Sequence, residues 1–181
     1  SLIALILFIF AVSAHGFSEE LTWKDVDGTR IPIPPSEHPR LYIRGNNAGD
    51  DIRQRLEDPV LEDAVLRLQR LAANSSQFRI EWDALQYMTT KDEALGRRVI
   101  TDCLEFLRGA ELPDRNDACR YTGRVMTTGA IVYDWLYPLL TTDEKQAYIR
   151  ELIRLAETQE CGYPPTRQGS VTGHSSEAMI M

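Results

Sequence analysis

Apolar residues recur at spacings of three and four over most of the chain, from about Asp50 to about Thr158. Two of these stripes are Leu61, Val65, Leu68, Leu71 and Leu95, Val99, Cys103, Phe106. Such spacing places the apolar side chains on one face of a helix, and no alternating run is long enough to indicate a sheet. Short connections between successive helices favour antiparallel hairpins. The pattern therefore predicts an all-α fold.

Residues at the ends of the stripes indicate where the helices begin and end. Asp58 is expected to cap a helix that starts at Pro59, because the first turn does not need the N–H that proline lacks. Thr141 and Glu144 form a predicted capping box. Gly109 is expected to close a helix in the left-handed conformation. Helices are expected at 50–56, from 59 through 71, at 80–88, 92–109 and 117–137, and from 141 to about 158.

Helical hairpins in series can form either of two architectures. One is an open solenoid of repeats, and the other is a closed (α/α) toroid. No repeat of about 34 residues is visible in the sequence, so the solenoid is the less favoured of the two architectures.

The first residues differ in composition from the rest. Residues 2–12 are almost wholly apolar and are followed by Val12-Ser13-Ala14, a small-residue pattern that suits signal peptidase. A run of about 11 residues is too short to span a bilayer, which needs ~20, so we expect a signal peptide cleaved after about Ala14 rather than a stable membrane anchor. The protein is then secreted or periplasmic. Because the run lacks a charged start and an initiating Met, and a helix is only beginning at Met181, we interpret the sequence as a fragment.

We divide the chain into residues 1–14, the incomplete signal peptide, residues 15–45, an extended Pro-rich leader, and residues 46–181, the helical domain. Ile31-Pro32-Ile33-Pro34-Pro35 disfavours helix in the leader. A short extended piece is expected at Leu41-Tyr42-Ile43.

The charge balance limits the partners. The formal charge is −7 and the pI is near 5.0, whereas a generic nucleic-acid-binding protein is basic, so we expect no nucleic acid. Recognition of an acidic glycan would have to be local, inside a cleft. The three cysteines, Cys103, Cys119 and Cys161, show no C-x-x-C spacing, and no metal site is predicted in this sequence.

The segment Thr172-Gly173-His174-Ser175-Ser176-Glu177 reads as a loop that enters a helix. If the helix begins near Ser175, His174 lies at its start and Glu177 lies on the same face. An imidazole and a carboxylate placed together can move a proton. The alternative is structural: His174 caps the helix and Glu177 is a solvated acid of the first turn.

The context of this segment favours the functional interpretation. Thr172 to Ile180 resembles the active-site segment of heparinase II, a bacterial polysaccharide lyase of the heparinase II/III group. Two further segments are similar to the N-terminal domain of that group. They are His38-Pro39-Arg40-Leu41-Tyr42-Ile43 and Tyr133-Asp134-Trp135-Leu136-Tyr137, the second followed by Leu140-Thr141. The resemblance covers about residues 36 to 181.

The resemblance implies an (α/α) toroid with later β-domains, and an acidic, uronate-containing polysaccharide, most readily heparin or heparan, as the substrate. It also implies that His174 removes the C5 proton of the uronate, and that Glu177 contacts and neutralises the substrate carboxyl. A catalytic Tyr, a second catalytic His and a structural zinc site are implied beyond Met181, so the fragment alone is expected to be inactive. The oligomeric state, a homodimer included, is left open.

The other candidates have structural alternatives. Arg120 and Arg124 share a helix face and can bind uronate or sulfate, although ion pairs between hairpins are the favoured interpretation. Trp135 is expected in the core, and His38 is interpreted as structural. Two other function classes remain: an exported helical-repeat binding module without catalysis, and a glycoside hydrolase on an (α/α) toroid. The hydrolase needs a second carboxyl group, which we do not find.

Overall fold

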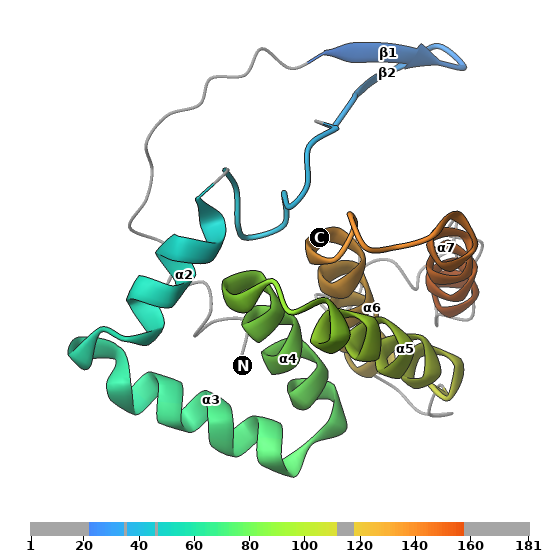
Figure 1. The fold of residues 1–181 in the computed structure, drawn as a ribbon. Helices are drawn as coiled ribbons and strands as arrows, with labels where there is room; N and C mark the ends of the chain where they lie inside the picture. Colours follow the sequence, from blue (N-terminus) through green and yellow to red (C-terminus); the bar gives the residue numbers. More distant parts are fainter. Residues whose placement is uncertain (1–21, 35, 46, 112–117, 158–181) are drawn as a thin grey trace.

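The computed structural model describes residues 22–34, 36–45, 47–111 and 118–157, and these form a mostly helical structure (Figure 1). The expectation of a mainly helical fold is confirmed. The elements are β1 Trp23–Val26, β2 Thr29–Pro32, α2 Ala48–Leu56, the 3-10 helix η1 Pro59–Leu61, α3 Glu62–Asn74, α4 Ser76–Thr90, α5 Glu93–Arg108, α6 Ala118–Trp135 and α7 Thr142–Glu157. The signal peptide expected at 1–14 lies outside the described residues.

The leader contains a β-hairpin, so the prediction that it is merely extended was incomplete. β1 and β2 pair antiparallel through a tight turn at Asp27 and Gly28, which have φ values of 48° and 79°. Asp-Gly is the typical sequence of a two-residue hairpin turn, because both central residues need a positive φ. Each strand has only four residues and all are exposed, so no buried alternation marks them in the sequence.

The extended piece expected at 41–43 was also wrong. The N–H of Ile43 donates to the carbonyl oxygen of Leu41 at 2.7 Å, across Tyr42 with φ 63°. An i to i+2 hydrogen bond around a positive φ is a γ-turn of the rare, strained kind. The chain turns sharply here instead of continuing as a strand.

Most local helix signals are confirmed. The Asp58 carboxylate accepts from the N–H of Val60, with Pro59 following it, and the Asp92 carboxylate accepts from the N–H groups of Ala94 and Leu95. Gly109 is not left-handed, because its φ is −79°. The residue that ends a helix in the left-handed conformation is instead Lys91, which follows α4 and has φ 55°.

The core lies among α4, α5, α6 and α7, with α2 and α3 packed against α4 (Figure 1). Trp135 is buried as expected, and Tyr148 rather than Ile149 faces the core from α7. On α6 the buried positions Val125, Thr128, Val132 and Trp135 share one face, while Tyr121 is exposed. Of the stripe on α3, only Leu68 is fully buried, so α3 covers the edge of the core.

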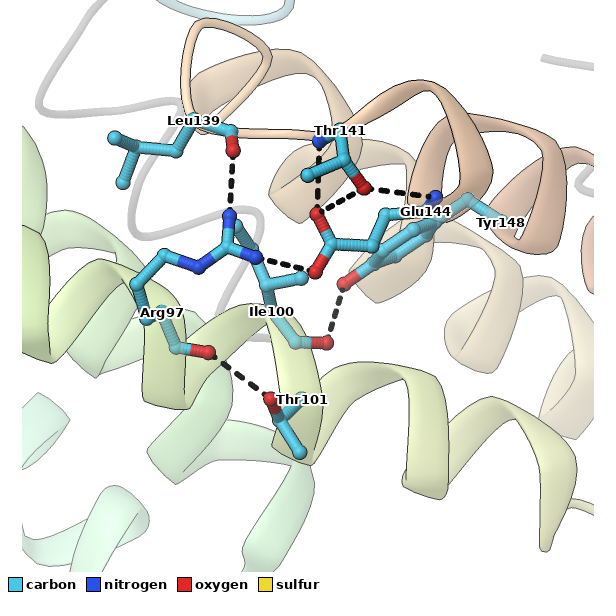
Figure 2. A network of polar contacts seen from close by, with 7 residues as sticks. All are labelled: Arg97, Ile100, Thr101, Leu139, Thr141, Glu144 and Tyr148. Carbon is cyan, nitrogen blue, oxygen red and sulfur yellow. Dashed lines mark hydrogen bonds and ion pairs between the residues drawn. The ribbon is translucent and has the colours of Figure 1, made fainter.

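A polar network joins α5 to the start of α7 (Figure 2). Glu144 accepts from the N–H and the hydroxyl of Thr141, which confirms the capping box, and it also pairs with Arg97 of α5. Arg97 donates in addition to the Leu139 carbonyl oxygen. Burial would raise the pKa of Glu144, but the bonds from Thr141 and Arg97 outweigh it and lower the pKa.

None of the helices in the described ranges has the length and apolar character that a bilayer crossing requires.

Candidate functional site

The predicted catalytic residues, His174 and Glu177, lie outside the described residues. Arg124, the predicted substrate-binding residue, is exposed on α6, and its carbonyl oxygen accepts a hydrogen bond from Gln77 Nε2 at 3.1 Å. The ion pair expected as its alternative role is not found within the described part of the chain.

Two of the segments that resemble the lyase family lie against each other in the structure. Asp134, near the end of α6, accepts three hydrogen bonds from residues 38–41. Its Oδ1 lies 2.6 Å from His38 Nδ1, and its Oδ2 lies 2.7 Å and 2.8 Å from the backbone nitrogens of Arg40 and Leu41. We define the Asp134 cluster as His38, Arg40, Leu41, Asp134, Trp135 and Tyr137.

The next residue of α6, Trp135, also binds the leader segment that contacts Asp134. Trp135 Nε1–H donates to the carbonyl oxygen of Leu41 at 2.9 Å, and the residue is only 2% exposed. Residues 40 and 41 thus have backbone groups satisfied by side chains of α6 rather than by a sheet or helix. The end of α6 therefore determines the path of the leader across the helices.

His38 is held on two sides. A carboxylate only accepts hydrogen bonds, so Nδ1 of His38 carries the hydrogen that faces Asp134. The imidazole stacks on Tyr137, with ring centroids 3.8 Å apart and planes 11° apart, and Lys145 Nζ lies 3.6 Å from the same tyrosine centroid. The His38 side chain is only 7% exposed. A carboxylate behind an imidazole also occurs in general bases, but stacking and burial here support the structural role expected of His38.

A pocket of about 310 Å³ lies beside the γ-turn. Its lining consists of Arg40, Tyr42, Ile43, Arg44, Ala48, Asp51 and Arg55, and we call it the arginine pocket. Three arginines and one aspartate thus contribute to its wall, and the guanidinium of one of them, Arg40, lies 3.7 Å from the Asp134 carboxylate. Tyr42, at the turn, is 38% exposed. The lining thus combines charged residues of both signs with a partly exposed tyrosine.

A second pocket, of about 380 Å³, lies where α2 meets the end of α4. His38, Arg53, Thr89 and Lys91 contribute to its lining. Arg53 pairs with Asp50 at 3.1 Å and donates to the Thr89 carbonyl oxygen, so its guanidinium joins α2 to α4. Burial lowers the pKa of Lys91, whose ammonium lies 5.4 Å from the Tyr87 ring centroid.

A buried acid lies between α4 and α6. Glu81 is 4% exposed, and its Oε1 accepts from the Thr128 hydroxyl at 2.5 Å. Its Oε2 has no hydrogen-bond partner among the described residues. Burial raises the pKa of Glu81, and the bonds from Thr128 and Gln77 only partly oppose that rise.

Burial disfavours ionisation of a thiol and a phenol near this acid, those of Cys103 and Tyr148, because it raises the pKa of both. Cys103 is a fully buried free thiol, and burial raises its pKa to about 12. Burial also raises the pKa of Tyr148, whose hydroxyl donates to the Ile100 carbonyl oxygen at 3.0 Å. A thiol reacts as its thiolate, so Cys103 serves packing rather than chemistry. The described ranges hold no group of three or more side chains suited to a metal ion.

No protein-family model matches the chain, and no curated protein gives a significant match. The functional assignment therefore depends on the sequence segments themselves.

The local sequence pattern predicts no role for Asp134, although the residue lies within a segment that resembles the lyase family. One signal was available. A carboxylate between Tyr133 and Trp135, on a helix with a strong apolar face, must either reach solvent or find hydrogen-bond donors. The pattern does not identify those donors, because they lie more than 90 residues earlier in the chain.

Proposed function

We propose that the whole protein is a polysaccharide lyase that cleaves a uronate-containing glycan by β-elimination. The observation that carries this proposal is the segment 172–180, in which His174 and Glu177 lie three residues apart in a context similar to heparinase II. The contact between the family-like segments around His38 and Asp134 supports it, because it gives both segments a shared structural reason to occur in one domain.

The chemistry follows from the substrate. The C5 hydrogen of a uronate is poorly acidic, because the adjacent carboxylate resists gaining the charge of an enolate. Neutralising that carboxylate lowers the barrier most, and Glu177 performs this role when it is protonated or shares a proton with the substrate. His174 then takes the C5 proton, and the C4–O bond breaks to leave a C4–C5 double bond. The departing oxygen takes a proton from the Tyr that the resemblance implies as the second proton-transfer residue. A base suited to neutral pH adds about 10²–10⁴-fold to the rate.

In this proposal α4 to α7 are hairpins of an (α/α) toroid, and the remaining helices and β-domains belong to the rest of the protein. A Tyr that transfers a proton, a second His and the structural zinc come from those later parts. The protein is exported through the signal peptide, and its substrate is an acidic polysaccharide. A local site for the acidic substrate is consistent with the net charge of −7.

The test is to incubate the whole purified protein with heparin, heparan sulfate, chondroitin sulfate and alginate. A lyase produces an unsaturated uronate, detected by ultraviolet absorbance together with new chain ends. A glycoside hydrolase would produce new reducing ends without that absorbance. A binding module would retain the polymer and produce neither signal. Absence of the unsaturated product with every uronate polymer would overturn the proposal.

A further inference from the structure

We infer that α6 and α7 together form the surface on which the segment 175–181 of the same chain packs. We define the α6–α7 face as Ala130 and Tyr133 of α6 with Ile149 and Ile153 of α7. The packing is inferred from the helices and the sequence, whereas its consequence for catalysis rests on the proposed function.

The order in which the helices pack is the first observation. α4 packs against α5 and α6, and α5 packs against α6 and α7. Each of these helices thus contacts the next one along the chain and the one after it. Of the described helices, α7 is the last in this series and lies at its edge (Figure 1). A further helix that continues the series packs against both α6 and α7.

The apolar surface of α7 is the second observation. Ile149 and Ile153 lie one turn apart and are 46% and 48% exposed. Ile149 lies between two residues that contact α6. Lys145 Nζ lies over the Tyr137 ring, and the Leu152 side chain lies so close to Gly129 that a Cβ added there would come within 3.1 Å of it. The exposed isoleucines therefore border the contact of α7 with α6.

The opposite side of α7 belongs to α5. Glu144 pairs with Arg97, and Arg154 donates to the Leu107 carbonyl oxygen. Ile153 follows Glu144 by about two and a half helical turns, which places it on the side away from α5. On α6, the half-buried Ala130 and Tyr133 lie one turn apart, and the Tyr133 ring contacts Tyr148 of α7 with centroids 6.0 Å apart. The α6–α7 face is thus apolar on both helices.

The composition of the segment 175–181 is the third observation. The sequence predicts a helix from about Ser175, and Ala178-Met179-Ile180-Met181 makes that helix apolar on every side. A helix that is apolar all round is buried by its neighbours. The connection 158–174 can reach any part of α7, which has 16 residues and is about 24 Å long. A second copy of the chain on the α6–α7 face would leave this apolar segment uncovered, so the segment itself is the better occupant.

The packing determines where the proposed catalytic pair points. Residues two apart lie on nearly opposite sides of a helix. Met179 packed on the α6–α7 face therefore turns Glu177 away from it, and His174, three residues before Glu177, shares the side of Glu177. In the lyase that we propose, the α6–α7 face thus holds both groups towards open space, where a substrate can reach them.

A photocrosslink on the whole protein tests the position of the segment. Ile153→p-benzoylphenylalanine, once irradiated, should become attached to the peptide that contains residues 175–181, as identified by mass spectrometry. Leu66→p-benzoylphenylalanine, at a 41% exposed position of α3, should not. Irradiating a mixture of ¹⁵N-labelled and unlabelled copies separates links within one chain from links between two.

Hydrogen exchange of the whole protein gives a second test. Glutamine favours a helix at least as well as isoleucine, so Ile149→Gln with Ile153→Gln should fold. Loss of two buried isoleucines should make the peptide with residues 175–181 exchange at least about tenfold faster. Leu66→Gln should leave its exchange unchanged.

Three results would overturn the inference: no link from position 153 to this peptide, links only between copies, or equal exchange in the double variant and the wild type. A link within the chain, without unsaturated product from any uronate polymer, would support the packing and contradict the lyase. Unsaturated product without that link would do the reverse.

Discussion

The buried carboxylate of Asp134 binds three groups of the leader and thereby fixes its path across the helices. Its side chain is 3% exposed, and it receives the His38 imidazole and two backbone N–H groups. The Arg40 guanidinium lies 3.7 Å away and partly offsets its charge. A buried charge is tolerated only when paired and hydrogen-bonded, and Asp134 meets both conditions with groups from one short segment. The position of the leader and the shape of the arginine pocket follow from it.

Replacing Asp134 with Ala should therefore cost more than a typical substitution. The change leaves the N–H groups of Arg40 and Leu41 without their acceptor, and we expect a loss of about 3 kcal/mol in the free energy of unfolding. Asp134→Asn keeps one acceptor oxygen and should lose less, about 1–2 kcal/mol. Urea denaturation of the three proteins measures both values. If Asp134→Ala unfolds at the wild-type midpoint, the carboxylate does not hold the leader.

From the raised pKa of the buried Glu81 carboxyl group we predict how the stability of the fold changes with pH. Its pKa is raised from 4.5 in the folded state, so the fold favours the protonated acid. The stability that this group contributes is complete below pH 4.5 and is lost as the pH rises through the folded-state value. Glu81→Gln has the same shape and does not ionise. The stability of this variant relative to the wild type should therefore increase from pH 4.5 towards neutral pH. A difference that stays constant over that interval would show that Glu81 ionises in the fold as it does in the unfolded chain.

At the scale of elements, the features that sequence predicted are those decided within a few residues. Asp58-Pro59, Asp92 and the pair Thr141 and Glu144 carry their own hydrogen-bond partners, so local chemistry was enough to place the helix starts. The left-handed end at Lys91 was missed, because the sequence offers a lysine where glycine is the usual residue. The short hairpin of the leader was missed because its strands bury nothing.

The packing of α2 on α4 provides a prediction at this scale. A Cβ added at Gly49 would lie 2.4 Å from the Met88 carbonyl oxygen, and backbone cannot yield as a side chain can. Gly49→Ala should therefore separate the two helices and cost about 1–3 kcal/mol. Gly109→Ala is the matched control, because φ is −79° and the nearest atom is 3.4 Å away.

Thermal or urea unfolding distinguishes the two variants. The control should equal the wild type or exceed it by up to about 1 kcal/mol, since alanine restricts the unfolded chain more than glycine does. Equal stability of Gly49→Ala and Gly109→Ala would mean that α2 does not approach α4 as closely as the structure places it.

At the scale of the whole molecule, the sequence predicted the helical class but not which distant segments meet. His38 and Asp134 are 96 residues apart, and neither the periodicity of the helices nor the end signals connect them. The arginine pocket likewise depends on a turn in the leader and on one face of α2, which are brought together only by folding. Contacts of this kind come from tertiary packing, which a local pattern does not encode. The resemblance identified the relevant segments without showing that they touch.

The most direct measurement compares two histidines: His174, the proposed catalytic base, and His38, which packs on Tyr137 beside Asp134. The turnover of the whole protein is followed by the absorbance of the unsaturated uronate, under conditions in which circular dichroism shows each variant folded. His174→Ala should lose at least about 10²-fold in rate without losing stability. His38→Ala should lose stability and keep its rate per folded molecule. Near-wild-type turnover by His174→Ala would contradict the proposed function.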